Sequence, residues 1–542
     1  MTYDAARADL AHWRDDYPAN PYDADEALRR GLHTHLDGAR LRALEARART
    51  FAADVVGVIA PAAARYENRA HLPEIARYDA LGHRVEEVSF DPSYHDAGAA
   101  LWRSGVVSLS GTPGTAFEQM SLLYLLSGEG EAGHACPATC TIGLARALRR
   151  RGSLAVRERF LGPLLDTTYE SAERGAQFLT EVQGGSDVGA NACQARPLGD
   201  GSYALTGEKW FCSVADAEQF FVTARVEDVE GTRGLGSFVV PRTLEGAPNG
   251  FALRRLKDKL GTRGLASGEI DFESARAWPV GPLDEGFRTA VSIVLNTSRW
   301  MTAVGSAGIM RRAVVEARNF ARRRRAFGVA IEDFAVVRRT LADMVAASEG
   351  ALGLVLALTE VEDRIDAETA SENDVLVHRF LVNVAKLIVS QQATRTVRAG
   401  IEVLGGNGTI EEFSVLPRLY RDAIVYESWE GTHNVLAAQV LNDLKRLPLL
   451  DAMRTYVDER LDESHPALEV AAVTLDDLER CLDDEDYASW HFREHLERFA
   501  VVLEALSCRR EAASHLVATV DRRYDATRDV DLPRRVEALV GD

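Results

Sequence analysis

The sequence predicts an α+β protein, because helical, β and again helical patterns follow one another along its 542 residues. Residues 41–60 and 117–126 repeat apolar side chains at helical spacing. From Gly175 to about residue 282 the pattern changes to short alternating runs with frequent turns, and after Gly286 the helical spacing returns. A chain of this length is expected to form several domains, at roughly 100–200 residues each.

The first helical segment is expected to form an N-terminal domain over residues 1–174. Residues 138–149 continue its helical pattern, whereas residues 78–98 contain turn-forming residues and are expected to be an irregular connection. Residues 175–285 are expected to form a small β-barrel or sandwich. Its clearest strand patterns lie at residues 202–214, 219–227, 235–242 and 268–280, and a Gly-Asp-Gly hairpin turn lies at 199–201.

Two helical segments follow the β domain. Residues 286–446 are expected to form a helical bundle, in which the pattern over 380–405 ends at a glycine cap. Residues 447–542 are expected to form a C-terminal helical extension that is rich in acidic residues. The sequence shows no internal repeat and no low-complexity linker.

Charge argues against nucleic acid as a general partner, because the net charge is −19 and phosphate binding needs a basic face. Residues 451–542 contain 23 acidic residues and 12 arginines, a net charge of −11. A local basic patch is still open, because arginines concentrate late in this segment, at Arg509, Arg510, Arg522, Arg523, Arg528, Arg534 and Arg535.

Other composition features exclude further classes. The sequence contains no run of about 18 apolar residues, so no membrane span is expected. The acidic N-terminus does not resemble a secretory signal. Six cysteines in 542 residues predict neither a disulfide framework nor a zinc site. A reducing cytoplasm is the expected location, and no metal is expected.

Two short motifs in the β segment could carry chemistry. Thr180-Glu181 is followed by a Gly-Gly-Ser turn, whose hydroxyl and N–H groups suit a polar ring or a phosphate, although a plain β-turn explains it equally simply. The run from Gly207 to Ser213 contains Trp210 and Phe211, which point to opposite faces of a strand. Phe211 could stack on a flat ring with Ser213 on its face, or both aromatic residues could belong to the core.

Two motifs in the later helical segments add to these. Four arginines, 322–325, precede Ala-Phe-Gly and could bind a pyrophosphate, or they could be a solvated charge run. Further on, Leu404-Gly405-Gly406-Asn407-Gly408 is followed by Trp429-Glu430-Gly431-Thr432. A carboxylate beside apolar bulk is expected to have a raised pKa, in the range useful for a base. The alternative is a glutamate at the start of a helix.

In this order and spacing the four motifs together resemble the acyl-CoA dehydrogenase family, and most of all its AidB-type branch. The resemblance covers about residues 175–445, and with the AidB-type features nearly the whole chain. It implies FAD as cofactor, an acyl-CoA or other acyl thioester as substrate, an electron-transfer flavoprotein as acceptor, and a homo-oligomer, either a dimer or a dimer of dimers.

The resemblance also implies roles for single residues. Glu430 removes the α-proton of the acyl thioester while the β-hydride goes to flavin N5. Thr180 binds the flavin ring, with Phe211 against it and Ser213 near N5. Further cofactor residues are Ser186, Arg324, Phe327, Gly405, Gly406, Thr432 and Asn434, of which Arg324 and Phe327 reach the FAD of a neighbouring subunit. The substrate side includes Arg299, Ser186 and Gly431.

The chain departs from the family pattern at several positions. Ala335 and Glu402 stand where many members carry glutamine, and Phe211 replaces the usual tryptophan. Ser298 precedes Arg299, so the alternative catalytic glutamate of a few members is absent, which leaves Glu430 as the candidate base. Three other functions remain open: an AidB-like flavoprotein that binds or protects DNA, a flavin oxidase or monooxygenase on the same fold, and a scaffold that keeps FAD for stability.

Overall fold

The structure, a computed structural model, describes residues 3–226, 229–524 and 532–540. The chain forms two compact units. Unit 1 comprises Met1–Ala53, Leu123–Gly130 and Thr302–Asp542, and unit 2 comprises Asp54–Leu122 and Glu131–Met301. Each unit is therefore built from segments that are far apart in the sequence.

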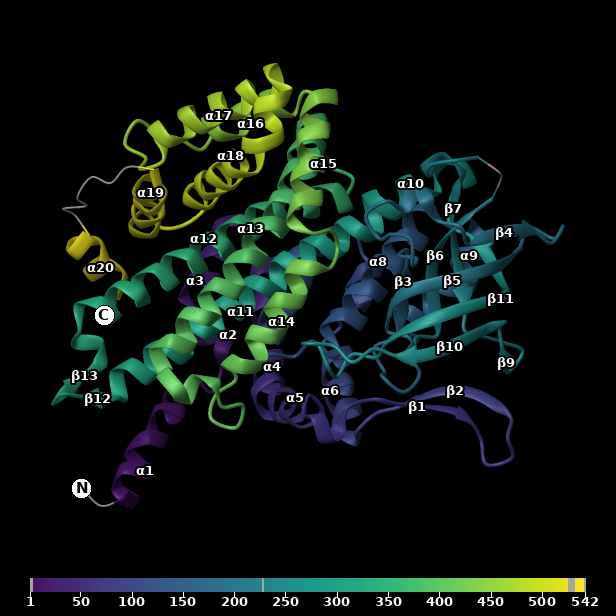
Figure 1. Ribbon diagram of the computed structural model, residues 1–542, viewed down its shortest axis with the longest axis horizontal. Coiled ribbons are helices and arrows are strands. Elements are labelled where there is room, and N and C mark those ends of the chain that lie inside the picture. The colour runs from purple at the N-terminus through teal and green to yellow at the C-terminus, as the bar shows by residue number, and fades with distance from the viewer. Residues whose placement is uncertain (1–2, 227–228, 525–531, 541–542) are drawn as a thin grey trace. The chain divides into compact units, whose positions relative to one another are not determined.

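Unit 2 contains a seven-stranded sheet (Figure 1). β7 pairs with both β6 and β11, which closes β11, β5, β4, β6 and β7 into a barrel, with β3 and β10 on its flanks. The expected barrel and all four expected strands are present. The strands are β3 (Gly175–Phe178), β4 (Gln194–Pro197), β5 (Tyr203–Ser213), β6 (Gln219–Arg225), β7 (Leu235–Pro241), β10 (Phe251–Leu256) and β11 (Ser267–Pro279), with a small hairpin of β8 (Thr243–Leu244) and β9 (Ala247–Pro248).

Helices pack beside this barrel within unit 2. α8 contacts β3 and α9, and a core cluster joins Leu144 and Leu148 of α8 to Phe221 and Val239 of the barrel. Burial of such apolar side chains is the main stabilising contribution to the fold. The helices are α5 (Ala60–Tyr66), α6 (Pro92–Arg103), α8 (Ala135–Arg151), α9 (Leu154–Leu164) and α10 (Gly286–Thr289), together with the first parts of α7 (Ala116–Gly128) and α11 (Asn296–Arg323).

One expectation for this region was wrong. Residues 78–98 contain parts of a β-hairpin and a helix: β1 (Glu74–Tyr78), β2 (Arg84–Ser89) and the start of α6. Asp79 closes the turn by accepting the N–H groups of Leu81 and His83 at 2.8 Å, and Asp91 caps α6. The strands are largely exposed, so they lack the apolar alternation by which a strand is recognised.

Unit 1 is helical. Its N-terminal helices are α1 (Tyr3–Ala11), α2 (Pro21–Ala24), α3 (Glu26–His35) and α4 (Gly38–Asp54), and a short hairpin of β12 (Arg325–Ala326) and β13 (Val329–Ala330) follows α11. The long helices α12 (Ala335–Asp366) and α13 (Glu372–Leu404) pack together and are followed by α14 (Leu416–Ser428) and α15 (His433–Arg446). α13 ends at Gly405 with φ of +64°, as the glycine cap predicted.

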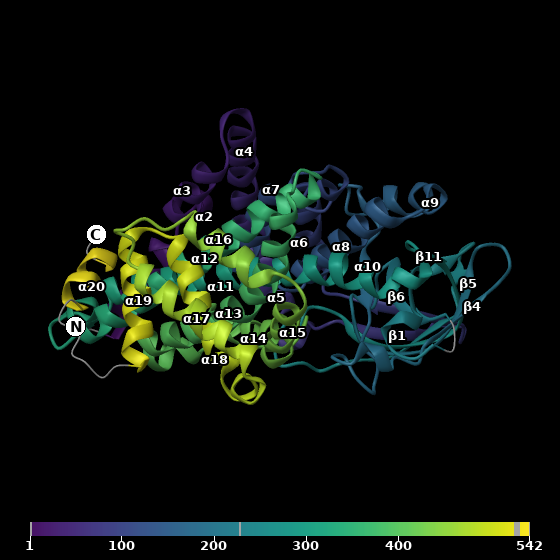
Figure 2. The ribbon, with the colours of Figure 1, turned by 90° about the horizontal axis from the view of Figure 1, so that it is seen from above.

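The C-terminal extension packs against these helices, as Figures 1 and 2 show for α18 and α19 beside α12. It consists of α16 (Leu449–Asp458), α17 (Leu468–Asp483), α18 (Glu485–Leu506), α19 (Arg510–Tyr524) and α20 (Leu532–Val540). A Cβ atom at Gly353 of α12 would lie 2.4 Å from the carbonyl oxygen of Ser507, so the lack of a side chain permits this close approach. α12 is long and apolar enough to cross a membrane, but 83% of its most apolar window is buried in the protein.

Candidate active site

The loop that follows β3 contains the first predicted flavin residues. Gly184 donates its N–H to the carbonyl of Glu181, forming a tight turn, and Trp210 of β5 donates its N–H to the carbonyl of Thr180 at 2.9 Å. A Cβ atom at Gly185 would lie 3.0 Å from the Thr180 hydroxyl oxygen. The structure thus joins the Thr180 loop to the strand that carries Phe211, and Ser186 lies exposed on the same loop.

A buried ion pair holds this loop in place. Lys209 donates to Glu181 Oε1 at 2.6 Å, and both side chains are almost fully buried. Glu181 also accepts the N–H groups of Ala192 and Cys193. Because a buried charge is tolerated only when it is paired and hydrogen-bonded, this arrangement fixes the position of the loop. Lys209 was not among the residues predicted from the sequence; its signal was a lysine inside a strand with aromatic neighbours.

The strand β5 carries a bulge at the predicted flavin face. Trp210 and Phe211 together lie opposite the single residue Glu269 of β11, between the pairs Lys209–Ile270 and Cys212–Gly268. Phe211 is 54% exposed, so its ring is available to a ligand. The bulge puts the rings of Trp210 and Phe211 on one side of the strand, where Lys257 lies 3.6 Å from the first ring and 4.7 Å from the second, so the prediction that they point to opposite faces was wrong.

Two neighbouring contacts add detail to this strand. Lys257 lies 3.6 Å above the Trp210 ring and 2.7 Å from Glu269, an arrangement that combines a cation–π contact with an ion pair. Ser213 contacts the hydroxyl of Ser267 at 3.3 Å. The aromatic pair on β5 therefore has a cation beside it.

The substrate-side arginine lies at the start of α11. Arg299 is 5% exposed, and its neighbour Ser298 accepts a hydrogen bond from the Gln177 amide of β3 at 2.8 Å. Next to it the Trp300 ring stacks with the guanidinium of Arg146, 5.0 Å away. Arg299 therefore lies nearly buried, between two neighbours whose side chains have partners in the protein.

In unit 1 the predicted base lies in a strained turn between α14 and α15. Glu430 has φ of +58° and Gly431 has φ of +103°. Lys386, a fully buried residue of α13, donates to the carbonyl of Gly431 at 2.7 Å and to that of Glu427 at 3.0 Å. Left-handed backbone at a non-glycine residue costs free energy and persists where the surroundings enforce it. The buried Lys386, which was not predicted from the sequence, is one such constraint.

The residues after the turn begin α15. Thr432 is the N-cap residue of α15, and Asn434 accepts a hydrogen bond from Arg493 of α18 at 2.7 Å. Between them, burial together with the charges of Lys386 and Arg493 lowers the pKa of His433 to about 4. His433 is therefore neutral at physiological pH.

The remaining predicted cofactor residues lie at another place in unit 1. Arg324 follows α11, and Phe327 is 98% exposed at the tip of the β12–β13 hairpin. Gly405 and Gly406 follow the end of α13. Three aromatic rings bring these segments to one end of the bundle: Phe320 lies 6.3 Å from Phe413, and Trp13 packs on both.

This end of the bundle is distant from Glu430. Lys386, which binds the Glu430 turn, and Leu404 are 18 residues apart on α13, which is roughly 27 Å at 1.5 Å per residue. The predicted site residues of unit 1 thus form two separate clusters. The first contains Glu430, Gly431, Thr432 and Asn434, and the second contains Arg324, Phe327, Gly405 and Gly406.

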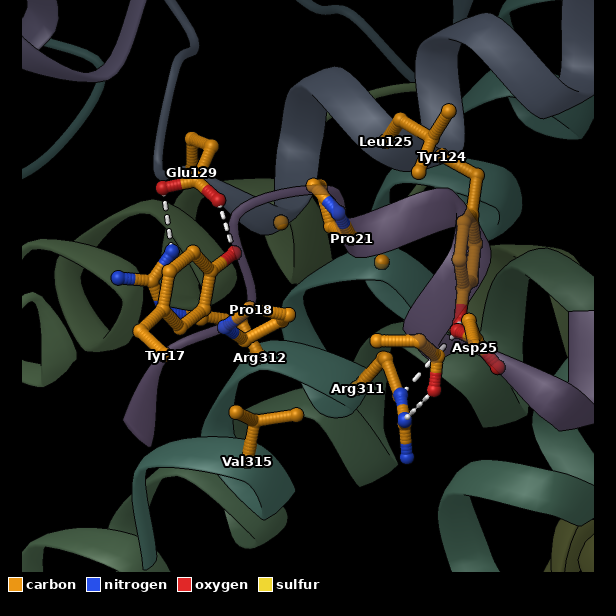
Figure 3. A pocket seen from close by; sticks show the side chains of 13 residues that line it. Tyr17, Pro18, Pro21, Asp25, Tyr124, Leu125, Glu129, Arg311, Arg312 and Val315 are labelled. Carbon is orange, nitrogen blue, oxygen red and sulfur yellow. Dashed lines mark hydrogen bonds and ion pairs between the residues drawn. The ribbon is translucent and has the colours of Figure 1, made fainter. Parts of the chain in front are cut away.

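A small pocket of about 40 Å³ in unit 1 contains none of the predicted residues (Figure 3). The hydroxyl of Tyr17 and the guanidinium of Arg312 both donate to the carboxylate of Glu129 there. On the other side, Asp25 is 3.1 Å from Arg311 and accepts a hydrogen bond from a buried tyrosine hydroxyl. These polar groups satisfy one another, so the pocket is explained as a structural network.

The structure describes the side chains of three of the seven late arginines, and two of these three have partners within the chain. Arg509 is paired with Glu349, and Arg510 donates to Ser464. Arg534 is exposed. Arg528 lies outside the described residues, and so do the side chains of Arg522, Arg523 and Arg535.

Comparisons with known proteins decide the family. Residues 15–171 match the adaptive response protein AidB N-terminal domain, residues 176–275 the acyl-CoA dehydrogenase middle domain, and residues 284–445 the acyl-CoA dehydrogenase C-terminal domain. The chain is 35% identical to the AidB protein of Escherichia coli (strain K12) over 387 residues, which is 69% of each chain. The chain belongs to the acyl-CoA dehydrogenase family.

One sequence relative and one solved structure match a larger share of this family member. It is 30% identical over 487 residues to acyl-CoA dehydrogenase family member 11 of Caenorhabditis elegans, covering 85% of this chain and 78% of the relative. Its fold is similar to the crystal structure of Caenorhabditis elegans ACDH-11 in complex with C11-CoA, with a TM-score of 0.84 and 26% identity over 96% of this chain and 91% of the other. The fold class, the family and its AidB-type branch are therefore confirmed.

Membership makes this chain an FAD-dependent oxidoreductase that acts on acyl-CoA. The described residues fit that cofactor, because the Thr180 loop offers a hydroxyl beside a glycine backbone and Phe211 offers an exposed ring. A DNA-directed role is not favoured, since the extension that would carry it has a net charge of −11 over residues 451–542.

Proposed function

We propose that Glu430 is the catalytic base of this acyl-CoA dehydrogenase. The observation that carries the proposal is the strained turn of Glu430 and Gly431, held by the buried Lys386. Strained backbone at a non-glycine residue is typical of catalytic positions. A carboxylate fixed in this way can meet the α-carbon of a thioester without paying the entropy of ordering a mobile loop.

In the proposed reaction the carboxylate of Glu430 takes the α-proton of the acyl group. FAD, when bound, supplies the acceptor for the β-hydrogen and its electron pair, so a carbon–carbon double bond forms between the α and β carbons. Thr180, Phe211 and Ser213 would hold the flavin end of FAD, and Arg299, Ser186 and Gly431 would lie on the substrate side. We propose an electron-transfer flavoprotein as the partner that reoxidises the enzyme.

We also propose that the site is shared between copies of the chain. The cluster of Arg324, Phe327, Gly405 and Gly406 is roughly 27 Å along α13 from the turn of Glu430. Phe327, 98% exposed at the tip of a hairpin, leaves its ring available for contact with a second copy. The two clusters would then serve two different cofactors, which requires at least a dimer.

The test is flavin reduction under anaerobic conditions. Acyl-CoAs with straight, branched and aromatic chains, and carrier-protein thioesters, are added to the FAD-loaded protein. One of them is expected to bleach the flavin absorbance, and Glu430→Gln should slow the bleaching at least about a hundredfold, the usual contribution of a general base. Glu411→Gln, which changes an exposed carboxylate paired with Arg421, is the matched control and should bleach normally.

Absence of bleaching by every thioester, at normal FAD content, would overturn the proposal. So would full-speed bleaching in Glu430→Gln. Sedimentation analysis tests the sharing separately: a monomer that binds FAD with full affinity would contradict it.

A further inference from the structure

The C-terminal extension contacts the start of α15, where the predicted cofactor residue Asn434 lies. Arg493 of α18 donates from Nη1 to Asn434 Oδ1 at 2.7 Å and from Nε to Glu497 Oε1 at 2.9 Å. Gln391 of α13 donates to the same Glu497 oxygen at 3.3 Å. The extension is thus joined to both α13 and α15 at this point, although it follows the matched C-terminal domain, which ends at residue 445.

The contact fixes which way the Asn434 amide points. A guanidinium carries only donors, so the amide atom that faces Arg493 must be the oxygen. The amide NH₂ group then points elsewhere and is the part of Asn434 that can meet a ligand. Glu497 holds the guanidinium by a second hydrogen bond, which limits its rotation about the last bonds of the side chain.

We propose that Arg493 and Glu497 are positioning residues for FAD, which turn the NH₂ group of Asn434 toward a hydrogen-bond acceptor of the ADP part of the cofactor. The inference rests on the proposed function and on the cofactor role that the family resemblance implies for Asn434. It assigns the extension a part in the flavin site. Arg493 acts through Asn434, and its partner Glu497 keeps it from turning into solvent.

The test measures FAD affinity in the full-length protein after removal of the cofactor. Arg493→Ala is expected to raise the dissociation constant of FAD about 3- to 10-fold, because the orientation of one neutral hydrogen-bonding group is lost. Arg493→Lys keeps a cationic donor without the fixed fork of the guanidinium and should recover part of the affinity. Arg493→Glu offers an acceptor, draws the NH₂ group toward itself and should bind FAD more weakly than Arg493→Ala does.

A matched control and a second ligand separate positioning from mere packing. Arg498→Ala removes an arginine from the same helix that pairs with Asp477, and it should leave FAD affinity unchanged. ADP, used as a competitor of FAD, should lose affinity in Arg493→Ala by the same factor as FAD. Riboflavin, which lacks the ADP part, should not.

Equal FAD dissociation constants for Arg493→Ala and Arg498→Ala would overturn the inference. So would a loss of riboflavin binding as large as the loss of FAD binding, because that indicates general loosening. If Arg493→Ala fails to fold, Arg493→Lys and Arg493→Glu are compared in the same way, and equal affinities overturn the inference. Loss of bleaching in Glu430→Gln is independent of these results, so the proposed function can stand while this inference fails, and the reverse.

Discussion

The two loops that carry the predicted chemistry, residues 180–187 in unit 2 and residues 429–432 in unit 1, are each held by a buried lysine. Lys209 pairs with the carboxylate of Glu181, whereas Lys386 donates to two backbone carbonyls. The described backbone of the first loop has no residue with positive φ, and the second has two in succession. A charge pair therefore holds a relaxed loop, and hydrogen bonds to carbonyls hold a strained one.

This difference suits the two proposed tasks. A flavin ring needs a fixed surface with a hydroxyl and an aromatic face, which the relaxed loop of Thr180 and the ring of Phe211 on β5 would provide together. A base needs its carboxylate at one defined place. Left-handed backbone at Glu430 points its side chain in a direction that a residue in the helices on either side of the turn would not have.

The largest effect is expected where a buried charge loses its partner. Lys209→Met leaves Glu181 buried without its cation and should lower the stability of the protein by about 3–5 kcal/mol. Urea unfolding followed by circular dichroism measures it. Lys445→Met removes a lysine whose partner Glu485 is exposed, and it is the control, with an expected loss below about 1 kcal/mol.

A double variant sharpens this prediction. Lys209→Met combined with Glu181→Gln removes both charges and should recover part of the lost stability. A loss below about 1 kcal/mol for Lys209→Met alone would mean that the ion pair does not hold the loop.

A smaller effect is expected at the second lysine. Lys386→Met leaves the carbonyls of Glu427 and Gly431 without this donor and should cost about 2–3 kcal/mol, since an unsatisfied buried group costs about 1–3 kcal/mol. The two lysine variants should also differ in FAD binding and in the rate of flavin bleaching, compared at equal concentrations of folded protein. Lys386→Met should bind FAD and bleach slowly, whereas Lys209→Met should bind FAD weakly. Weak FAD binding in Lys386→Met, with normal binding and slow bleaching in Lys209→Met, would contradict the tasks proposed for the two loops.

The stability of the protein should depend on pH through His433, which lies beside the turn of Glu430. Burial, with the charges of Lys386 and Arg493, lowers the pKa of His433 to about 4. The unfolded chain takes up this proton near pH 6.5 and the folded chain only near pH 4, so stability is lost as the pH falls through that window. After allowance for partial exposure the loss is about 1–2 kcal/mol.

Stability measured against pH tests this directly. His433→Gln should make the curve shallower between pH 6.5 and 4 without flattening it, because burial also lowers the pKa of His134, to about 3. His12→Gln, at an exposed position, is the control and should leave the slope as in the parent protein. An unchanged slope in His433→Gln would show that His433 does not contribute to it.

The sequence predicted much of this architecture and less of its site. Apolar periodicity was sufficient for the helical segments and for β5, β6, β7 and β11, because their buried faces are regular. It missed the β1–β2 hairpin, whose strands are exposed, and it could not place the bulge at Trp210 and Phe211, which depends on the partner strand β11.

The candidate site residues were chosen by motif order, which does not show how they group in space. The separation of Glu430 from Gly405 is set by the length of α13. The packing of Trp13, Phe320 and Phe413 brings the segment after α13 to the end of α11. The two buried lysines escaped notice because a sequence shows neither burial nor the carbonyls that a lysine meets.

The smallest effect compares two variants of the strained residue. Glu430→Gln and Glu430→Asn both lack the base, but asparagine tolerates a φ of +58° better than glutamine does. Glu430→Asn should therefore be more stable than Glu430→Gln by about 0.5–1 kcal/mol, measured by urea unfolding. At Glu494, an exposed helical position of α18, the order should reverse, because asparagine is the weaker helix former. Equal stability of the two Glu430 variants would show that the turn carries no strain and that the contrast with the Thr180 loop lies in the lysines alone.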